Sequence, residues 1–599
     1  MKPLICNFSQ NLNVGGPAIS NFKFQIRNLP WFFLCVLCVL CGETAVQAAA
    51  LDRSAFTFTA YDLRAQVVPA GQGFDVTGRV TLRNDSSAPQ RFIALQISST
   101  LGWKSIALAG KPAAFSSGPY TTDIDHTGSV SEAVVTLSQA IPPKGAIELE
   151  VSYAGTIPSD ATRLTRIGAP PVAAAQSDWD QISEAFTGVR GVGYVCWYPV
   201  ALEAASLSNG SELSAVIGAW RERHAASTFH LTLVLASDNL IATNGRLLDQ
   251  KATNTADGPV HARQYDFSPI GLAPPTFTIA DYTLLNRPAI NVLHLSGHQA
   301  GAQEYQLAAE KLLPAISDWF GAPRERVVVV ELPEGYAPFN SGAMLFTPLV
   351  DSGRQAVEVA VAHPLARACL DAQRPWIAEG LAHFAQALVR ERQDGRKAAL
   401  AYLQQFRPAL ADAEQQARAT PAGSSIPAEG EPLDRATDEI YYRGKAMFVW
   451  WMLRDMVGDA ALQRAFHQYH AADDKEPAYV QRLVEAASQR KLEWFFDDWV
   501  YRDRGLPDFR VDSVFPRQTL PEPGPVIVTV TVQNDGDAGA EVPIIIPVEK
   551  GEAMERVQVA AHSKNSTRLS IPAIPTEATV NDGSVPESDV SNNSFTLKK

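Results

Sequence analysis

Alternating apolar and polar positions dominate the first half of the chain. Between about residues 55 and 160 they form short runs, AFTFTAYDLRAQV, FDVTGRVTLRN, RFIALQIS and AIELEVSYAG, which clusters of turn-forming residues separate. A second set, HLTLVLAS, RQYDFS, TFTIADYTL and AINVLHLSG, follows after about residue 190. Because successive side chains of a strand point to opposite faces, this pattern predicts a large antiparallel β domain over residues 51–298.

The spacing of apolar residues changes after about residue 300. The runs EYQLAAEKLLPAISDWF, QAVEVAVAH, PWIAEGLAHFAQALVRER and RKAALAYLQQFRPALADAEQQA have helical periodicity, and RVVVVEL is a short buried strand. The polar loop ATPAGSSIPAEGEP separates them from three more helical runs, YYRGKAMFVWWMLRDMVG, AALQRAFHQYH and LVEAASQRKLEWFFDDWVYR. We therefore expect a mainly helical domain over residues 299–505.

Strand-like runs return beyond Gly505, with VIVTVTVQN, EVPIIIPVEK, VQVAAHSKNSTRLSIP and SNNSFTLKK. They predict a C-terminal β-sandwich over residues 506–599. A chain of 599 residues is also too long for one hydrophobic core. The expected fold class is therefore α+β and multidomain, with a β domain, a mainly helical domain and a β-sandwich in that order.

The first fifty residues have the features of an export signal. Lys2, Lys23 and Arg27 precede the apolar run LPWFFLCVLCVLCG, which small residues follow in TAVQAAA. A basic flank, a short apolar stretch and an A-x-A-like end are typical of a secretory signal peptide. We predict a signal peptide over residues 1–50, with the alternative of a retained signal anchor, and expect a periplasmic or extracellular bacterial protein. The apolar run is short for a membrane span, so the mature chain is expected to have none.

Charge and cysteine content narrow the remaining options. The net charge of −13 argues against a nucleic-acid partner, which would require a basic face. Cleavage of the signal would leave Cys196 and Cys369 as the remaining cysteines. Two cysteines so far apart do not form a disulfide framework, and we expect two buried thiols.

The chemistry of the chain centres on residues 361–386, VAHPLARACLDAQRPWIAEGLAHFAQ. A zinc-hydrolase site of the His-Glu-x-x-His type has two histidines one helical turn apart, a glutamate beside the first as general base, and another glutamate as third ligand. Here His363 keeps the first ligand position, and Glu379 stands at the third-ligand position. Pro364 occupies the general-base position, and Arg367 replaces the second histidine.

With these residues, the chain resembles the aminopeptidase-N-like gluzincin metallopeptidases, of the membrane alanyl aminopeptidase type, with a degenerate zinc motif. The resemblance covers about residues 55–515 and implies a thermolysin-like catalytic-type domain. YYRGKAMFVWWMLRDMVG resembles the helix that carries the family's transition-state tyrosine, which implies this position for Tyr441. SGAMLF resembles the Gly-Ala-Met-Glu-Asn strand, which implies substrate binding by Gly342, Ala343 and Met344. The tail resembles a bacterial cell-adhesion-related, Ig-like sandwich.

Three residues of this segment have alternative interpretations. Pro364 is disfavoured inside a helix, so we expect a helix that starts or kinks there. Arg367 either forms a salt bridge with Glu379 or points to solvent. His383, one helical turn after Glu379, either joins His363 and Glu379 in a displaced metal site or has no contact with a metal.

Two functions follow from these alternatives. The first is an exported pseudo-enzyme of the metallopeptidase family, with lost or strongly altered peptidase activity and a retained peptide-binding cleft. The second is an active zinc-dependent hydrolase that uses a rearranged site of His363, Glu379 and His383. The expected cofactor is zinc in the second case and none in the first. The expected partner is a peptide or protein, and the C-terminal sandwich is a candidate for contact with a surface partner.

Overall fold

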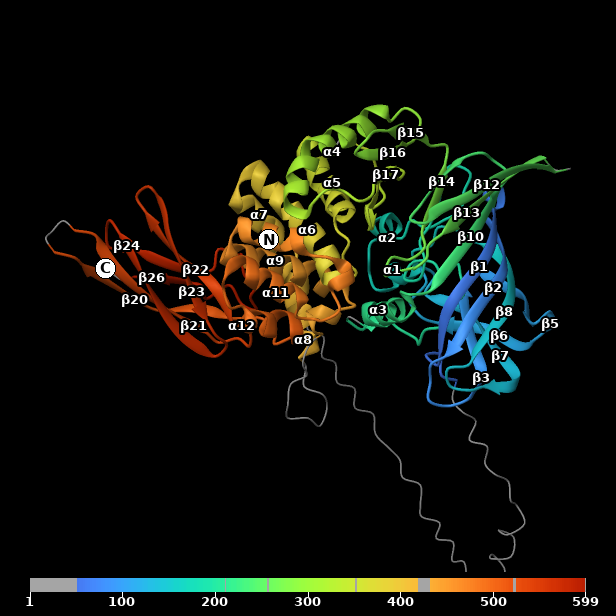
Figure 1. The fold of residues 1–599 in the computed structure, drawn as a ribbon, viewed down its shortest axis with the longest axis horizontal. Coiled ribbons are helices and arrows are strands. Elements are labelled where there is room, and N and C mark those ends of the chain that lie inside the picture. Colours follow the sequence, from blue (N-terminus) through green and yellow to red (C-terminus); the bar gives the residue numbers. More distant parts are fainter. Residues whose placement is uncertain are drawn as a thin grey trace, which may run out of the picture. The chain divides into compact units, whose positions relative to one another are not determined.

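The computed structural model describes residues 51–210, 212–255, 258–350, 353–418, 431–520 and 524–597. The expected signal peptide over residues 1–50, and most of the polar loop that begins at residue 419, lie outside the described residues. Figure 1 follows the described chain from the N-terminal strands through the helices to the C-terminal strands. No described helix is both long and apolar enough to cross a bilayer.

An eight-stranded sheet organises the N-terminal region, in the order β12-β13-β10-β1-β2-β8-β4-β5. Its pairs are antiparallel except for β1 and β10, which run parallel. In β1, Leu63, Ala65 and Val67 are buried while the residues between them are exposed, as the alternation predicts. The strands are β1 (Phe56–Val68), β2 (Gly73–Asn84), β4 (Leu101–Leu108), β5 (Lys111–Pro112), β8 (Ala146–Thr156), β10 (Thr228–Leu235), β12 (Arg246–Thr255) and β13 (Gly258–Asp266).

Two smaller sheets and three helices complete this region. The sheets have the orders β3-β7-β6 and β11-β14-β9. The helices were missed by the sequence pattern, although α3 buries Leu213, Ile217 and Trp220 at helical spacing. The elements are β3 (Gln90–Ser98), β6 (Ala114–Thr121), β7 (Ser129–Ile141), β9 (Thr187–Val189), β11 (Leu240–Thr243), β14 (Phe277–Ala280), α1 (Thr162–Arg166), α2 (Pro171–Ser177) and α3 (Glu212–His224).

Strands β15 (Thr283–Asn286) and β16 (Ile290–His294), which the sequence pattern assigns to the N-terminal β domain, belong to another sheet. They join β17 (Val327–Glu331), β18 (Phe339–Ser341) and β19 (Met344–Thr347) in the order β15-β16-β17-β19-β18. β16, β17 and β19 run parallel to one another. The change of partner is decided by pairing across the sheet, which local alternation does not encode.

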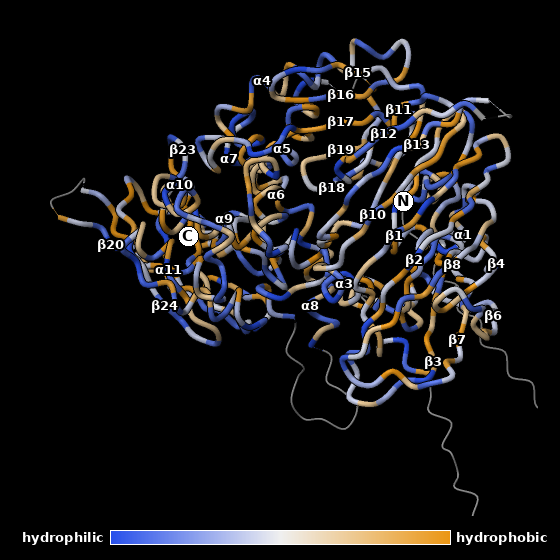
Figure 2. Tube along the Cα trace, turned by 45° about the vertical axis from the view of Figure 1, so that its right-hand side comes forward, coloured by the Kyte–Doolittle hydropathy of each residue, from blue (hydrophilic) through white to orange (hydrophobic). Residues whose placement is uncertain are grey.

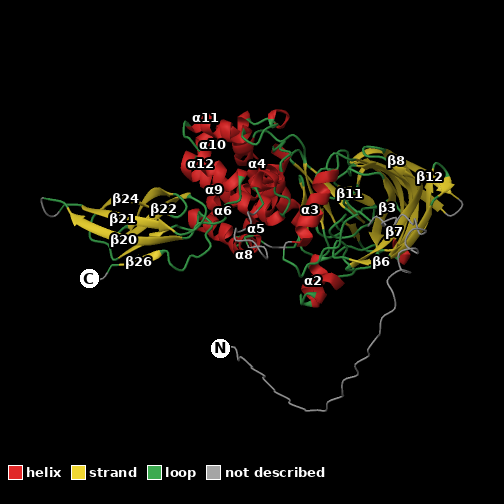
Figure 3. Ribbon diagram, turned by 90° about the horizontal axis from the view of Figure 1, so that it is seen from below, coloured by secondary structure: helices red, strands yellow, loops and turns green. Residues whose placement is uncertain are grey.

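The helices lie between these sheets and the C-terminal strands, and Figure 3 shows them as one continuous group. α4 ends at Gly321, whose φ of 89° suits glycine. The predicted helix over residues 483–502 is interrupted near Gln489, which has a φ of 57°. The elements are α4 (Gln299–Phe320), α5 (Arg354–Cys369), α6 (Pro375–Asp394), α7 (Arg396–Gln404), α8 (Arg407–Ala417), the π-helix η3 (Ile440–Lys445), α9 (Ala446–Val457), α10 (Asp459–Gln468), α11 (Tyr479–Ser488), α12 (Glu493–Phe496) and the π-helix η5 (Asp497–Tyr501).

The expectation that α5 starts at Pro364 is wrong, because the helix runs without interruption from Arg354 through Pro364 to Cys369. Proline has no N–H to donate to the carbonyl of Ala360. Contacts of α5 with both α4 and α6 offset this loss, since His363, Pro364, Leu365 and Ala366 are buried. Burial of one helix between two others therefore outweighs the local preference of proline.

The C-terminal strands form two antiparallel sheets, β20-β21-β24 and β23-β22-β25-β26. Their inward residues share one buried cluster with the helices and with β16 and β17. Figure 2 shows apolar stretches along the central helices and in the N-terminal strands. The strands are β20 (Phe509–Gln518), β21 (Val526–Asn534), β22 (Ala540–Val548), β23 (Gly551–Val559), β24 (Ser563–Ile571), β25 (Glu577–Val580) and β26 (Ser594–Thr596).

Candidate functional site

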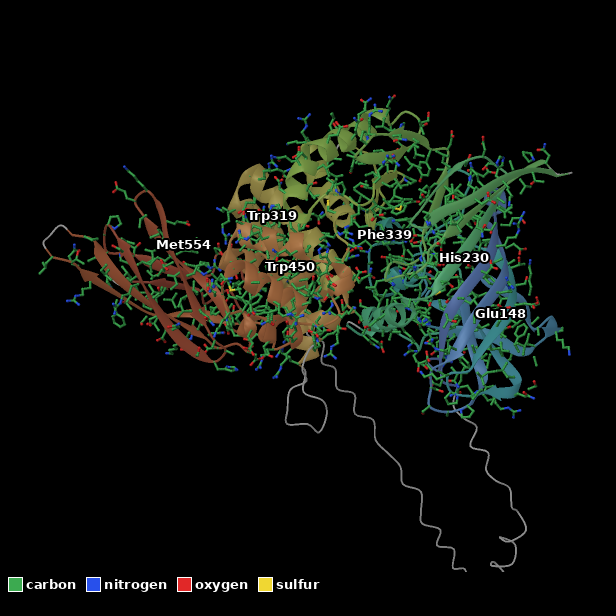
Figure 4. The ribbon with its side chains drawn as sticks, viewed as in Figure 1. Glu148, His230, Trp319, Phe339, Trp450 and Met554 are labelled. Atoms are coloured by element: carbon green, nitrogen blue, oxygen red, sulfur yellow. The ribbon has the colours of Figure 1, made fainter. Side chains whose placement is uncertain are left out.

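Helices α5 and α6 lie against each other and bring the chemistry of residues 361–386 together. Pro375 occupies the first turn of α6, where its missing N–H costs nothing. The Trp376 ring stacks on Trp450 at 4.8 Å, and Trp450 Nε1 donates a hydrogen bond to the Trp376 carbonyl at 3.1 Å. Figure 4 labels Trp450 among the central helices. These contacts hold the start of α6 and thereby position Glu379 on its second turn.

Glu379 is surrounded by nitrogen atoms from α5 and η3. Its Oε2 lies 3.1 Å from His363 Nε2, with which it forms a hydrogen bond. Arg367 Nε lies 3.3 Å from Glu379 Oε1, and Arg443 Nε lies 3.5 Å from Oε2. Of the two alternatives for Arg367, the structure contains the ion pair with Glu379, and it adds a second guanidinium.

The charge balance at Glu379 favours the ionised carboxylate. Burial raises the pKa of Glu379, but His363, Arg367 and Arg443 together lower it well below its usual range. The side chain is 16% exposed, whereas His363 is fully buried. Glu379 therefore has its positive partners in place without any bound ligand.

His383 lies beside His363, with ring centroids 5.1 Å apart. One donor atom each from His363, Glu379 and His383 lies within 4.8 Å of the others. Burial, His363 and Arg443 lower the pKa of His383 well below its usual value, so its imidazole is neutral. The displaced His-Glu-His set considered from the sequence is thus brought together.

This donor set has the right number and type of ligands for zinc, but its surroundings do not fit the ion. Zinc-bound histidines have their second ring nitrogen anchored by a hydrogen bond, whereas Nδ1 of His363 is buried without a hydrogen-bond partner. In addition, the guanidinium groups of Arg367 and Arg443 occupy positions beside the carboxylate that would face the metal. Two permanent positive charges there oppose a divalent cation.

Tyr441, at the position implied for the transition-state tyrosine, lies in the π-helix η3. Its hydroxyl is buried without a hydrogen-bond partner, and the Lys445 ammonium lies 5.6 Å from its ring. Burial raises the pKa of Tyr441, and its strongest charged neighbours after burial are Glu414 and Asp503. Glu379 is instead among the charges that act on Tyr442, whose pKa burial also raises.

Gly342, Ala343 and Met344 form the turn between β18 and β19 and the first residue of β19. Gly342 has a φ of 59°, which the turn requires. Ala343 and Met344 are buried, and Met344 packs beside Trp179 and Phe346. β19 is hydrogen-bonded on both sides, to β17 and β18, so it has no free edge to pair with an extended peptide.

Sequence reasoning missed Arg443 as a site residue. It lies in the run YYRGKAMFVWW, where a charged residue in an otherwise aromatic and apolar stretch is the available signal. Arg443 Nη1 donates to Glu439 at 2.7 Å in addition to facing Glu379. Only the juxtaposition of η3 with α6 reveals its role, because more than sixty residues separate Arg443 from Glu379.

No protein-family model and no curated protein sequence matches this chain. The structure is similar to that of the M1 zinc metallopeptidase from Deinococcus radiodurans, with 15% identity, coverage of 75% of this chain and 94% of that chain, and a TM-score of 0.45. It is also similar to a mutant of a two-domain M1 zinc metallopeptidase bound to L-tryptophan, with 18% identity, coverage of 76% and 96%, and a TM-score of 0.47. At these values the likeness does not assign an activity or a ligand to this chain.

Proposed function

We propose that this chain is an exported, non-catalytic relative of the aminopeptidase-N-like gluzincin metallopeptidases that binds peptides or extended protein segments at the Glu379 site. One observation supports this proposal most directly. Arg367 and Arg443 pair with the carboxylate that a gluzincin would offer to zinc, at 3.3 and 3.5 Å. The export signal and the family resemblance supply the location and the ancestry.

The residue beside His363 supports the loss of peptidase activity. Pro364 has no acid or base group, and it is buried within α5. A positioned general base contributes about 10²–10⁴-fold to a hydrolytic rate. The Glu379 carboxylate does not replace the missing base, because its ion pairs favour the ionised, low-pKa form, which is a weak base.

Metal content and hydrolysis, measured on the same preparation, test the proposal. The chain is incubated with zinc and dialysed, its zinc is quantified by mass spectrometry, and hydrolysis of an alanyl-coumarin substrate is followed with and without 1,10-phenanthroline. We expect no retained zinc and no chelator-sensitive turnover, together with measurable binding of a fluorescein-labelled oligoalanine peptide.

One zinc per chain with chelator-sensitive turnover would overturn the proposal in favour of the rearranged zinc hydrolase. In that case His383→Ala would lose both the metal and the activity. His467→Ala, which changes an exposed histidine on α10, is the matched control and would retain both.

A further inference from the structure

Among the described residues, the ion-pair network that includes Glu379 contains more guanidinium groups than carboxylates. Arg443 donates to Glu439 at 2.7 Å and faces Glu379, while Arg221 lies 3.9 Å from Glu439. With Arg367, three guanidinium groups therefore share two carboxylates within ion-pair distance. The charge of Arg367 also acts on Glu325, but no ion pair joins them.

Most of the hydrogen-bond donors on these groups are not used by the protein. A guanidinium carries five N–H donors. Among the described residues, Arg367 donates no hydrogen bond, and its ion-pair partner is Glu379 alone. Arg443 donates only to Glu439, and its Nε is buried without a hydrogen bond. The site therefore lacks acceptors.

A ligand from solvent can reach these two side chains. Arg367 is 20% exposed and Arg443 is 29% exposed, although Nε and Nη1 of Arg367 are buried. Nη2 of Arg367 and Nη2 of Arg443 are not among the buried atoms that lack a hydrogen bond. Each of the two guanidinium groups therefore keeps N–H donors that no protein group accepts. Such donors match the two oxygens of a carboxylate.

We infer that Arg367 and Arg443 bind a carboxylate of the peptide ligand, either its C-terminal carboxylate or an acidic side chain. The inference rests on the proposed function and adds the charge of the group that is recognised. It reverses the preference implied by the resemblance, in which the Gly-Ala-Met-Glu-Asn strand binds the amino terminus of the substrate and Leu345 and Phe346 stand in place of its Glu and Asn. At the corresponding positions Leu345 and Phe346 are buried apolar residues, so they offer a cationic amine no carboxylate.

A set of four peptides measures this preference on the full chain. The probes are N-acetyl-tetraalanine with a free C-terminal carboxylate, its C-terminal amide, the same amide with one internal glutamate, and tetraalanine amide with a free amino terminus. We expect the free carboxylate or the glutamate peptide to bind about 10–100-fold more tightly than the neutral amide, since a hydrogen bond to a charged group contributes on that scale. The comparison of these two probes identifies the source of the carboxylate.

Substitutions locate the recognition. Arg443→Gln and Arg367→Gln are expected to abolish the difference between acidic and neutral peptides while binding of the neutral amide persists. Arg367→Gln leaves the negative charge of Glu379 with one positive partner fewer. The double variant Arg367→Gln with Glu379→Gln removes both charges and tests the same loss of preference for acidic peptides. Arg482→Gln is the control, since that guanidinium is 54% exposed on α11 and pairs with Glu476.

Three outcomes are decisive. A preference for the carboxylate that Arg443→Gln removes supports the inference. Equal affinities, or a preference for the free amine, overturn the inference and leave the proposed peptide binding intact. Absence of binding by all four peptides overturns both.

Discussion

A guanidinium at position 367 changes what the Glu379 site can hold, because it is permanently charged and has no lone pair for a metal. Arg367 lies one helical turn after His363 on α5, at the spacing that puts two side chains on the same face. An imidazole at this position would complete a His-His-Glu zinc set, whereas the guanidinium forms an ion pair with Glu379 instead. Position 367 is thus where the ion-pair site differs from a His-His-Glu donor set, while Arg443 remains as a second cation beside Glu379.

The substitution Arg367→His tests this residue-scale argument. It removes a positive charge and adds a donor beside His363 and Glu379, so we expect the variant to retain zinc after dialysis where the original chain does not. Arg367→Gln, which removes the charge without adding a ligand, is expected to retain none. Zinc content by mass spectrometry is the measurement, and equal zinc in the original chain and in Arg367→His would contradict the role of the guanidinium.

At the scale of elements, a buried lysine connects η3 to two neighbouring segments. Lys445 is fully buried, and its ammonium donates to Glu414 on α8 and to Asp503 beyond η5, each at 2.7 Å. These bonds tie two segments, α8 and the one that follows η5, to the π-turn that carries Tyr442 and Arg443. The site therefore depends on a cation that does not touch it.

Lys445→Met is expected to destabilise the chain by about 3 kcal/mol, because it leaves the buried carboxylates of Glu414 and Asp503 with Arg418 alone as a positive partner, at 3.5 and 3.4 Å. Urea unfolding monitored by tryptophan fluorescence measures the change. Lys104→Met is the matched control, since Lys104 forms an ion pair of 2.6 Å with Asp75 in which both side chains are about half exposed. Its expected effect is below about 1 kcal/mol, and similar losses for both variants would refute the argument.

At the scale of the whole described chain, the C-terminal strands are joined to the helices through the segment 581–593. Arg396 pairs with Asp582 at 3.0 Å, Gln404 donates to the Gly583 carbonyl at 2.8 Å, and Arg407 donates to the Glu587 carbonyl at 3.2 Å. The Glu587 side chain is fully buried and accepts hydrogen bonds from the Phe509 N–H at 2.9 Å and from Asn593 at 2.7 Å. A buried carboxyl group thus lies in the connection between two regions.

This carboxyl group predicts a pH-dependent stability. Burial raises the pKa of Glu587 to about 7, despite the hydrogen bonds that lower it. A raised folded-state pKa means that stability is complete below about pH 4.5 and is lost as the pH rises to about 7, by about 3 kcal/mol. Glu587→Gln is expected to remove this dependence, so the variant gains stability relative to the original chain between pH 5 and 7.

Urea unfolding at pH 5 and at pH 7 measures the free energy of unfolding of the original chain and of Glu587→Gln. Glu552→Gln, at an exposed position of β23, is the control and should leave the pH dependence of stability unchanged. If the original chain and Glu587→Gln change in parallel with pH, the assignment to Glu587 is wrong.

Local patterns were sufficient for the order of the elements and for several site residues. Periodicity located most helices and strands of the described chain, and the spacing of His363, Arg367 and Glu379 led to the ion pair that the structure contains. Burial of Cys196 and Cys369 as free thiols is also confirmed. These features depend on contacts within a helix or between consecutive elements, which sequence spacing encodes.

Tertiary structure alone decided the remaining features, because they depend on contacts between distant segments. Packing against α4 and α6 keeps α5 helical through Pro364, and pairing with β17 places β16 in the sheet β15-β16-β17-β19-β18. Arg443 reaches Glu379 only because η3 folds back against α6. The sequence by itself thus determined which chemical groups α5 and α6 carry, and the fold determined which of them meet.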